Sequence, residues 1–405
     1  MKIKTKITSI VLLLVLAFSL SSCVFYNVVS DLDSGEQTPV GDVTINVDEV
    51  KNHDITINTS ETESEVAAAK ALMSSVSIQT TTASGSGVII KLSEDKSEAY
   101  ILTNYHVVYD SSTRQVSKNI KVYLYGMESY LYSSNTPNYA MSATYVGGTM
   151  KYDLAVLKIT ASNVLLNSNA RACEFADSNK VTVLEAAIAI GNAAGDGISA
   201  TMGKVNVESE NIEILAVDDR TPLSLRVMRT DAAVNSGNSG GGLFNSKGEL
   251  IGIVNAKSAS STTDNIGFAI PSNVAKYIAE NIIYYCDGTS YEHAYKCMLG
   301  ITVRVKELYT EYDEEAGILY RKEKVAVDTI REKSAAAYGI LNAGDVINSI
   351  TIDGTTYEVT RTFHVIDAML NARVSSVVVV NVTRGTQKTD ITVPLSEKDK
   401  VNADS

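Results

Sequence analysis

Short apolar runs separated by glycine, asparagine, aspartate and serine recur along most of the first two thirds of the chain. Each run has the length of a strand, and the polar clusters between the runs are typical of turns. Many short strands with few helices predict an all-β sandwich or barrel. The predicted strands begin at Val76-Ser77-Ile78 and continue at 87–92, 98–103, 120–125, 143–147, 154–159, 187–190, 203–207, 223–229, 242–245 and 250–255.

Helices are predicted at both ends of this β-rich part. An alanine-rich stretch at 65–74 precedes it, and a helix that starts at Pro271-Ser272 and runs to Tyr285 closes it, with proline and serine as start signals. The pattern then changes to that of a small α+β unit. Its predicted strands are 318–320, 345–352, 377–384 and 390–393, and its predicted short helices are 335–338 and 363–370.

The N-terminus has the pattern of an export signal. Three lysines within the first six residues precede an apolar run from Ile10 to Leu20, which is too short to cross a bilayer comfortably. Leu20-Ser21-Ser22-Cys23 resembles the lipobox of bacterial lipoproteins, so Cys23 is the expected acylated residue and membrane anchor. An ordinary secretory signal with an incidental cysteine is the alternative.

These patterns divide the chain into six segments. They are a lipoprotein signal peptide at 1–23, a disordered acidic tether at 24–65, the β-rich unit at 66–284, a linker at 285–297, the α+β unit at 298–396 and a polar tail at 397–405. The net charge of -12, with 47 acidic and 35 basic residues, argues against nucleic acid as a partner. Because of the predicted lipoprotein signal, we expect an extracytoplasmic protein of the bacterial cell envelope.

Three cysteines remain after the signal, at 173, 286 and 297. Export permits a disulfide between Cys286 and Cys297, but we expect free, mostly buried thiols. None of the three has metal-ligand spacing, so no metal site is predicted.

Ser239 is the candidate nucleophile, since Gly237-Asn238-Ser239-Gly240-Gly241 sets it in a glycine-flanked turn. Glycines let successive backbone N–H groups point at one spot beside the hydroxyl, as an oxyanion hole requires. The alternative is a flexible Gly/Ser loop, as expected for 84–87 of the same chain. A strand that resumes at Gly242 anchors the turn and favours the nucleophile.

A serine nucleophile needs a base and a carboxylate that orients the base. His106 ends a strand in apolar surroundings, whereas the other three histidines fall in the tether, or in or beside the α+β unit. A lone histidine among apolar residues is more often structural, but this one completes a consistent set. Asp153 directly precedes an apolar strand, where an unpaired carboxylate is costly. A solvent-exposed strand entry is the alternative for Asp153.

His106, Asp153 and Ser239, in this order and within these flanking sequences, resemble the HtrA (Do-like) branch of chymotrypsin-fold serine proteases. The resemblance covers about 66–395. Further matching segments are 189–192, 201–203, 252–255 and 266–271. It implies a mainly β, chymotrypsin-like double β-barrel protease domain with the active site between the barrels. It also implies oxyanion donors at the N–H groups of Gly237 and Ser239, no cofactor, and a homotrimer.

The α+β unit resembles a PDZ domain, with Leu299-Gly300-Ile301 as the loop that binds a peptide's terminal carboxylate. Small residues at 334–336 and the segment 343–347 support this resemblance. It implies that C-terminal peptides bind there by strand addition. The alternative is a generic α+β spacer.

The resemblance also suggests what is cleaved. Ala233 stands six positions before the nucleophile, so the primary pocket is expected to be apolar and to accept small or medium aliphatic residues of unfolded polypeptides. The alternative is that the Asp231 carboxylate reaches the floor of this pocket, in which case the protease would select basic residues. Extended substrate is expected to pair with Asn255, Ala256 and Lys257. A non-catalytic peptide-binding chaperone on the same fold is the alternative function.

Overall fold

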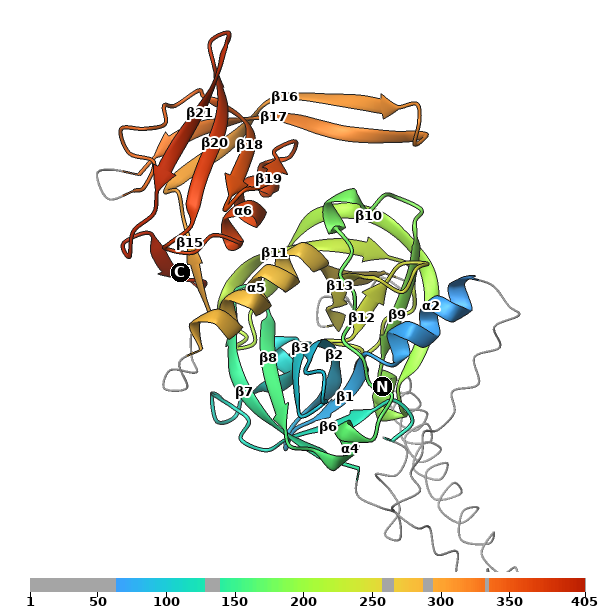
Figure 1. Cartoon of the computed structure of the whole chain (residues 1–405). Helices are drawn as coiled ribbons and strands as arrows, with labels where there is room; N and C mark the ends of the chain where they lie inside the picture. The colour runs from blue at the N-terminus through green and yellow to red at the C-terminus, as the bar shows by residue number, and fades with distance from the viewer. Residues whose placement is uncertain (1–62, 128–138, 257–265, 287–293, 332–334, 405) are drawn as a thin grey trace, which may run out of the picture. The chain divides into compact units, whose positions relative to one another are not determined.

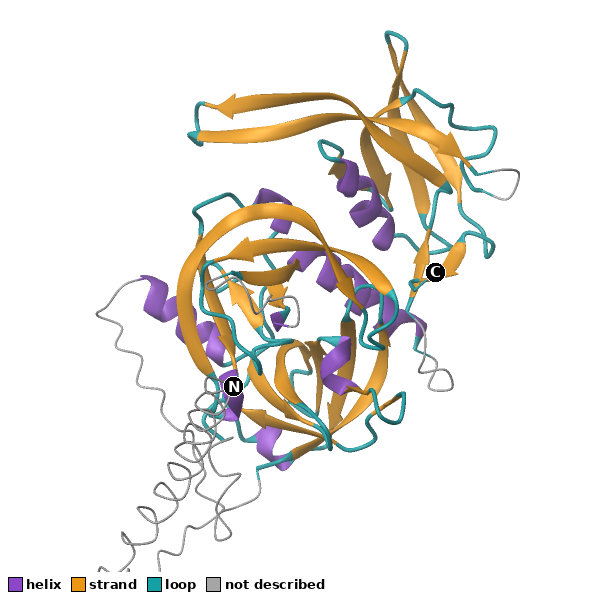
Figure 2. Cartoon of the chain, turned by 180° about the vertical axis from the view of Figure 1, so that it is seen from behind, coloured by secondary structure: helices purple, strands orange, loops and turns teal. Residues whose placement is uncertain are grey.

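The structure, a computed structural model, describes residues 63–127, 139–256, 266–286, 294–331 and 335–404. All of these residues belong to one structural unit, Lys51–Ser405. Strands predominate over helices throughout (Figure 2), which confirms the mainly β prediction. Cys23 and Lys257 lie outside the described residues.

The first six-stranded sheet closes into a barrel (Figure 1). Its strands are rich in valine, isoleucine and leucine, which fit a buried pleated surface. The side chains of Ile78, Ile101 and Leu157 fill it and have no exposed surface. In barrel order the strands are β1 (Ser75–Gln79), β2 (Ser84–Leu92), β3 (Glu98–Thr103), β8 (Leu154–Thr160), β7 (Met141–Thr149) and β6 (Ile120–Leu124).

A second six-stranded barrel follows in the chain. Phe244 lies fully buried in the core, and a Cβ added to Gly242 would lie 2.2 Å from the ring of Phe244, so only glycine fits there. In barrel order the strands are β10 (Ser199–Leu215), β11 (Pro222–Thr230), β14 (Gly267–Pro271), β13 (Leu250–Val254), β12 (Gly242–Phe244) and β9 (Ala186–Gly191). Two closed barrels confirm the predicted double-barrel architecture.

Helices α2 (Glu63–Leu72) and α5 (Ser272–Tyr285) flank the barrels, within two residues of their predicted positions. Ala275, Ile278 and Ile282 of α5 lie on one helical face and are buried in the apolar core. The shorter elements are α3 (Tyr105–Val108), α4 (Asn163–Leu166), β4 (Tyr109–Asp110), β5 (Gln115–Val116) and the 3-10 turns η3 (Ser178–Lys180) and η4 (Ala193–Gly195).

Residues 294–404, here called the C-terminal module, form an antiparallel sheet with one helix and a separate strand pair. Helix α6 (Thr362–Leu370) confirms the helix predicted at 363–370. The helix predicted at 335–338 is wrong, because this segment consists of bends and turns. The strands are β15 (Tyr295–Cys297), β16 (Ile301–Asp313), β17 (Ile318–Ile330), β18 (Val346–Ile352), β19 (Thr355–Glu358), β20 (Val377–Arg384), β21 (Gln387–Pro394) and β22 (Lys400–Asn402).

Two further expectations have definite outcomes. Residues 84–87 are not a flexible loop, because they begin strand β2 and Ser86 is buried. Cys173, Cys286 and Cys297 are free thiols, as expected, and burial raises the pKa of Cys173 to about 12. Among the helices that the structure describes, none is long and apolar enough to cross a membrane.

Replacing Leu157 by alanine should lower the free energy of unfolding by about 2–5 kcal/mol, because the side chain is fully buried and its loss leaves a cavity in the first barrel. Leu319→Ala is the matched control, since that leucine is 65% exposed, and it should have almost no effect. Urea unfolding monitored by circular dichroism measures both. Equal effects of the two substitutions would contradict this assignment of the barrel core.

Candidate active site

The pairing of two neighbouring strands brings His106 and Asp153 together. Strand β3 pairs with β8 up to Thr103 and Ala155, so the residues just beyond these ends must lie close to each other. His106 Nδ1 lies 2.6 Å from Asp153 Oδ2. The backbone N–H of His106 donates to the second carboxylate oxygen of Asp153 at 3.0 Å. The carboxylate therefore fixes the imidazole ring at one edge and leaves Nε2 for other partners.

Asp153 is held from three sides and is only 6% exposed, so the alternative of an exposed strand entry is wrong. Its φ of 50° is left-handed, a conformation that aspartate and asparagine tolerate better than other residues with side chains. The Asn255 amide donates to Asp153 Oδ2 at 2.8 Å, and the Asn104 amide donates to the Asp153 carbonyl at 2.9 Å. The bonds from Asn255 and His106 satisfy a carboxylate that would otherwise be costly to bury, and the Asn104 bond fixes the Asp153 backbone.

Ser239 lies in a buried turn in which N–H groups with and without partners alternate. Asn238, Gly240 and Gly241 each donate a backbone hydrogen bond within the protein, to Asn235, Val254 and Asn238 respectively. The N–H groups of Gly237 and Ser239 donate to no acceptor among the described residues. Buried N–H groups are nearly always paired, so two unpaired donors beside one hydroxyl indicate a place for a negatively charged oxygen.

Gly237 adopts a backbone conformation that requires glycine. Its φ is 97°, and a Cβ at this position would lie 2.2 Å from the Asn192 carbonyl oxygen. The backbone N–H of Ala194 donates to the Ser236 carbonyl at 2.8 Å. In a trans peptide the N–H points opposite to the carbonyl, so the Gly237 N–H points away from Ala194.

The serine turn of the second barrel lies against the histidine segment of the first. A Cβ on Gly85 would lie 2.7 Å from the Val107 methyl groups and 3.1 Å from the Ser239 carbonyl oxygen. A Cβ on Gly240 would lie 3.0 Å from the backbone nitrogen of Asn104. Ser239 Oγ and His106 Nε2 are not hydrogen bonded in the described structure, and such catalytic bonds often form only when substrate is bound.

The arrangement offers a hydroxyl, an imidazole oriented by a carboxylate, and two unpaired main-chain donors. This set can transfer a proton from the hydroxyl and stabilise a tetrahedral oxyanion. Among the described residues, no group of three His, Cys, Asp or Glu side chains is placed to hold a metal ion.

The residues expected near substrate lie around the same turn. Ala233 is exposed, and Thr201 Oγ1 donates to its carbonyl at 2.9 Å. The Asp231 carboxylate accepts from the backbone N–H of Lys204, a residue within strand β10, at 2.6 Å. Asn255 is fully buried, its N–H donates to the Phe268 carbonyl, and its side chain contacts Asp153. Ala256 directly follows it and is half-buried.

In the C-terminal module, the segment 299–301 lies against the small residues at 335–337. Gly300 has a φ of 73°, and a Cβ there would lie 2.3 Å from the Ala335 Cβ. The Leu299 carbonyl accepts from the Ala337 N–H, and Ile301 begins strand β16. This placement leaves the carboxylate-binding role of the loop a prediction.

Sequence reasoning missed three contributions to the site. Asn104 received no role, Asn255 was assigned to substrate rather than to Asp153, and Ser86 was placed in a flexible loop. An asparagine two positions before a candidate histidine was an available signal for Asn104. No local signal marks the other two, because their contacts join residues about a hundred or more positions apart.

Part of the chain is similar to a known family of peptidases. Residues 85–253 match the family of trypsin-like peptidase domains. The chain is 36% identical over 204 residues to the serine protease Do-like HtrA of Bacillus subtilis (strain 168), an alignment of 50% of this chain and 40% of the relative. It is 33% identical over 275 residues to the serine protease Do-like HtrA of Lactococcus lactis subsp. lactis (strain IL1403), covering 66% of this chain and 60% of that protein.

A solved structure of an HtrA-type protease AlgW with tripeptide is 28% identical, covers 82% of this chain and 95% of its own, and has a TM-score of 0.49. The matched part of the chain spans 40% to 60% of the length of the two relatives named above. The chain therefore carries a trypsin-like peptidase domain at residues 85–253, and it is similar to HtrA (Do-like) serine proteases.

Proposed function

We propose that the chain is a serine endopeptidase that uses Ser239 as nucleophile, His106 as general base and Asp153 as the carboxylate that orients the base. The observation that carries this proposal is the 2.6 Å contact between His106 and Asp153 beside a turn with two unpaired N–H groups. A binding protein would gain nothing from such unpaired buried donors, whereas acyl transfer requires them.

In the proposed reaction, Ser239 Oγ attacks the carbonyl carbon of a peptide bond while His106 Nε2 takes the hydroxyl proton. The oxyanion accepts hydrogen bonds from the N–H groups of Gly237 and Ser239. His106 then gives its proton to the leaving amine, and an acyl-enzyme remains. Water attacks this ester by the same route and releases the acid. Asp153 stays ionised and stabilises the imidazolium through Nδ1.

The proposed substrates are unfolded or misfolded exported polypeptides, cleaved after small or medium aliphatic residues. The Asp231 carboxylate is engaged with the Lys204 N–H, which favours an apolar primary pocket near Ala233 over a pocket with a charged floor. Unfolded chains expose more extended segments to a protease cleft than folded proteins, which offer mainly their termini and loop tips. Substrate would lie along the segment from Asn255 to Lys257.

The C-terminal module is proposed to be a PDZ domain, at 298–396, that binds C-terminal peptides and regulates the protease domain at 66–284. Leu299, Gly300 and Ile301 would bind the terminal carboxylate, supported by the left-handed Gly300 at the start of an exposed strand. We also propose a lipid anchor at Cys23, a tether that extends over 24–65 up to the start of α2 at Glu63, and trimeric assembly. The predicted linker at 285–297 and tail at 397–405 instead contain the strands β15 and β22, which pair with each other.

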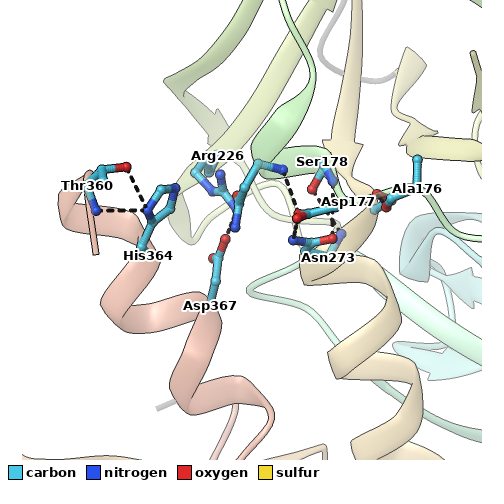
Figure 3. A network of polar contacts seen from close by, with 10 residues as sticks. Ala176, Asp177, Ser178, Arg226, Asn273, Thr360, His364 and Asp367 are labelled. Atoms are coloured by element: carbon cyan, nitrogen blue, oxygen red, sulfur yellow. Dashed lines mark hydrogen bonds and ion pairs between the residues drawn. The ribbon is translucent and has the colours of Figure 1, made fainter. Parts of the chain in front are cut away.

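A polar network supports this regulation (Figure 3). Arg226 of β11 donates to Asp367 of α6 at 2.5 Å, and both side chains are buried. Burial raises the pKa of Asp367 to about 6. His364, one turn earlier on α6, accepts from the Thr360 N–H at 3.2 Å, and burial lowers the pKa of His364 to about 4. Removing one partner of a buried ion pair is costly, so the Arg226–Asp367 pair ties α6 to the protease domain. In the proposed regulation, a peptide that binds the C-terminal module acts on the protease domain through α6.

Wild-type protein should hydrolyse unfolded casein, and Ser239→Ala should reduce hydrolysis to background. Asp153→Asn should lower kcat by about 10⁴-fold, because asparagine keeps the left-handed backbone but cannot orient and stabilise the imidazolium. Release of fluorescent peptides measures both. Equal hydrolysis by wild type and Ser239→Ala would end the proposal and favour a peptide-binding chaperone.

Peptides that differ only in the residue before the cleaved bond should be cut faster with valine or alanine than with arginine there. The reason is that no carboxylate is expected in the primary pocket, because Asp231 is bound to the backbone of β10. Mass spectrometry of cleaved peptide mixtures measures the preference. Asp231→Asn should leave it unchanged, and a preference for arginine that disappears in this variant would assign Asp231 to the pocket instead.

Asp367→Asn should change how stability depends on pH between about pH 4 and pH 6.5. With its raised pKa, Asp367 binds more protons in the folded state, so its contribution to stability falls as pH rises. His364, with its lowered pKa, contributes in the opposite direction over the same interval.

Asp367→Asn removes the contribution of Asp367 and leaves that of His364, so the stability of the variant should rise more steeply with pH than that of wild type. Urea unfolding at several pH values measures the slopes. The variant should also be less stable overall, because Arg226 stays buried without its partner. Parallel curves for the two proteins would contradict the burial of an ionisable pair at this contact.

A further inference from the structure

Ser86, in the first barrel, contacts the serine turn of the second barrel through both its backbone and its side chain. Its N–H donates to the Ser239 carbonyl at 2.8 Å, and its hydroxyl donates to the Gly237 carbonyl at 2.7 Å. The hydroxyl also accepts from the Asn192 N–H at 2.8 Å. The side chain is 1% exposed, so water cannot replace these bonds. One residue therefore holds the carbonyl groups of both residues whose N–H groups have no partner.

The order of peptide groups in the turn explains how the bonds from Ser86 affect the two unpaired N–H groups. Four successive peptide groups run from residue 236 to residue 240. The first and third carry the unpaired N–H groups of Gly237 and Ser239, and the second and fourth carry the carbonyls that Ser86 holds. A peptide group is rigid, so fixing the second and fourth limits how the first and third can rotate.

The turn needs such an external hold because its first residue is glycine. Gly237 has a φ of 97°, and glycine resists rotation of its flanking peptide groups less than any other residue. The Ser86 hydroxyl is suited to the position, since it can accept from one backbone N–H and donate to a carbonyl at the same time. Alanine can do neither, and a carboxylate could only accept.

We propose that Ser86 is a positioning residue for catalysis, which sets the N–H groups of Gly237 and Ser239 in the orientation that binds the oxyanion. This inference rests on the proposed protease function and adds to it a residue outside the triad and the oxyanion donors. Ser86 does not touch substrate. It acts through the turn, and it makes the oxyanion donors of the second barrel depend on the first barrel that carries His106 and Asp153.

The test compares wild type, Ser86→Ala and Ser86→Cys in casein hydrolysis and in inactivation by diisopropyl fluorophosphate. In that reaction the Ser239 oxygen bonds to phosphorus, fluoride leaves, and the phosphoryl oxygen occupies the oxyanion site. Removing one oxyanion donor costs about 10²–10³ in kcat, so loosening two should lower kcat and the inactivation rate by about tenfold to a hundredfold. KM and the shape of the pH–rate profile should stay unchanged, because His106 and Asp153 are untouched.

Ser75→Ala is the matched control. Ser75 is also a buried serine of the first barrel, 2% exposed, whose hydroxyl donates to a backbone carbonyl, that of Ala71 at 2.9 Å, away from the serine turn. Ser75→Ala should lower the stability of the protein about as much as Ser86→Ala does, and it should leave kcat unchanged. Ser86→Cys, whose thiol is a weaker donor of similar size, keeps the packing and should show an intermediate kcat even if Ser86→Ala folds poorly.

The outcomes separate the two proposals. If wild type neither cleaves casein nor reacts with the fluorophosphate, the protease function fails and the role of Ser86 fails with it. If wild type reacts and folded Ser86→Ala or Ser86→Cys reacts equally fast, only the role of Ser86 is overturned. An equal loss of kcat in Ser75→Ala would also overturn it, because the effect would then follow from stability alone.

Discussion

The hydrogen bonds that cross between the two barrels are the contacts on which the site depends. A closed barrel has no free strand edge, so the barrels cannot be joined by strand pairing. Apolar side chains from both barrels share one core, including Leu102 from the first and Phe244 from the second. Such packing brings the barrels together without fixing one hydroxyl against one imidazole. Short polar contacts provide that alignment, such as the hydrogen bond from the Ser86 N–H to the Ser239 carbonyl.

Much of the fold could be predicted from the sequence because it follows from local patterns. Apolar runs between turn residues predicted eleven of the twelve barrel strands, and proline and serine marked the start of α5. The candidate triad could be selected because glycine on both sides of Ser239, a single suitable histidine and a costly carboxylate before an apolar strand each restrict the choice. The pairing of β3 with β8 then explains why His106 and Asp153 meet.

The rest could not be predicted because it depends on contacts between distant residues. Nothing near Asn255 in sequence shows that its amide reaches Asp153, and Ser86 resembles any serine in a glycine-rich stretch until Gly237 is placed beside it. The segment 335–338 contains good helix formers, yet it forms turns against Gly300. Tertiary contacts decided these positions against local propensity.

The C-terminal residues are a further segment whose contacts the sequence pattern did not predict. Residues 397–405 read as a polar tail, yet β22 pairs with β15 and the Asp404 carboxylate accepts from Thr149 Oγ1 at 2.5 Å and from the Lys151 N–H at 2.9 Å. These residues belong to the turn that leads into Asp153. Because Asp153 holds a left-handed conformation, its position depends on how firmly that turn is fixed. The C-terminal module thus contacts the peptidase domain through Asp404, next to the turn that leads into Asp153, as well as through the Arg226–Asp367 pair.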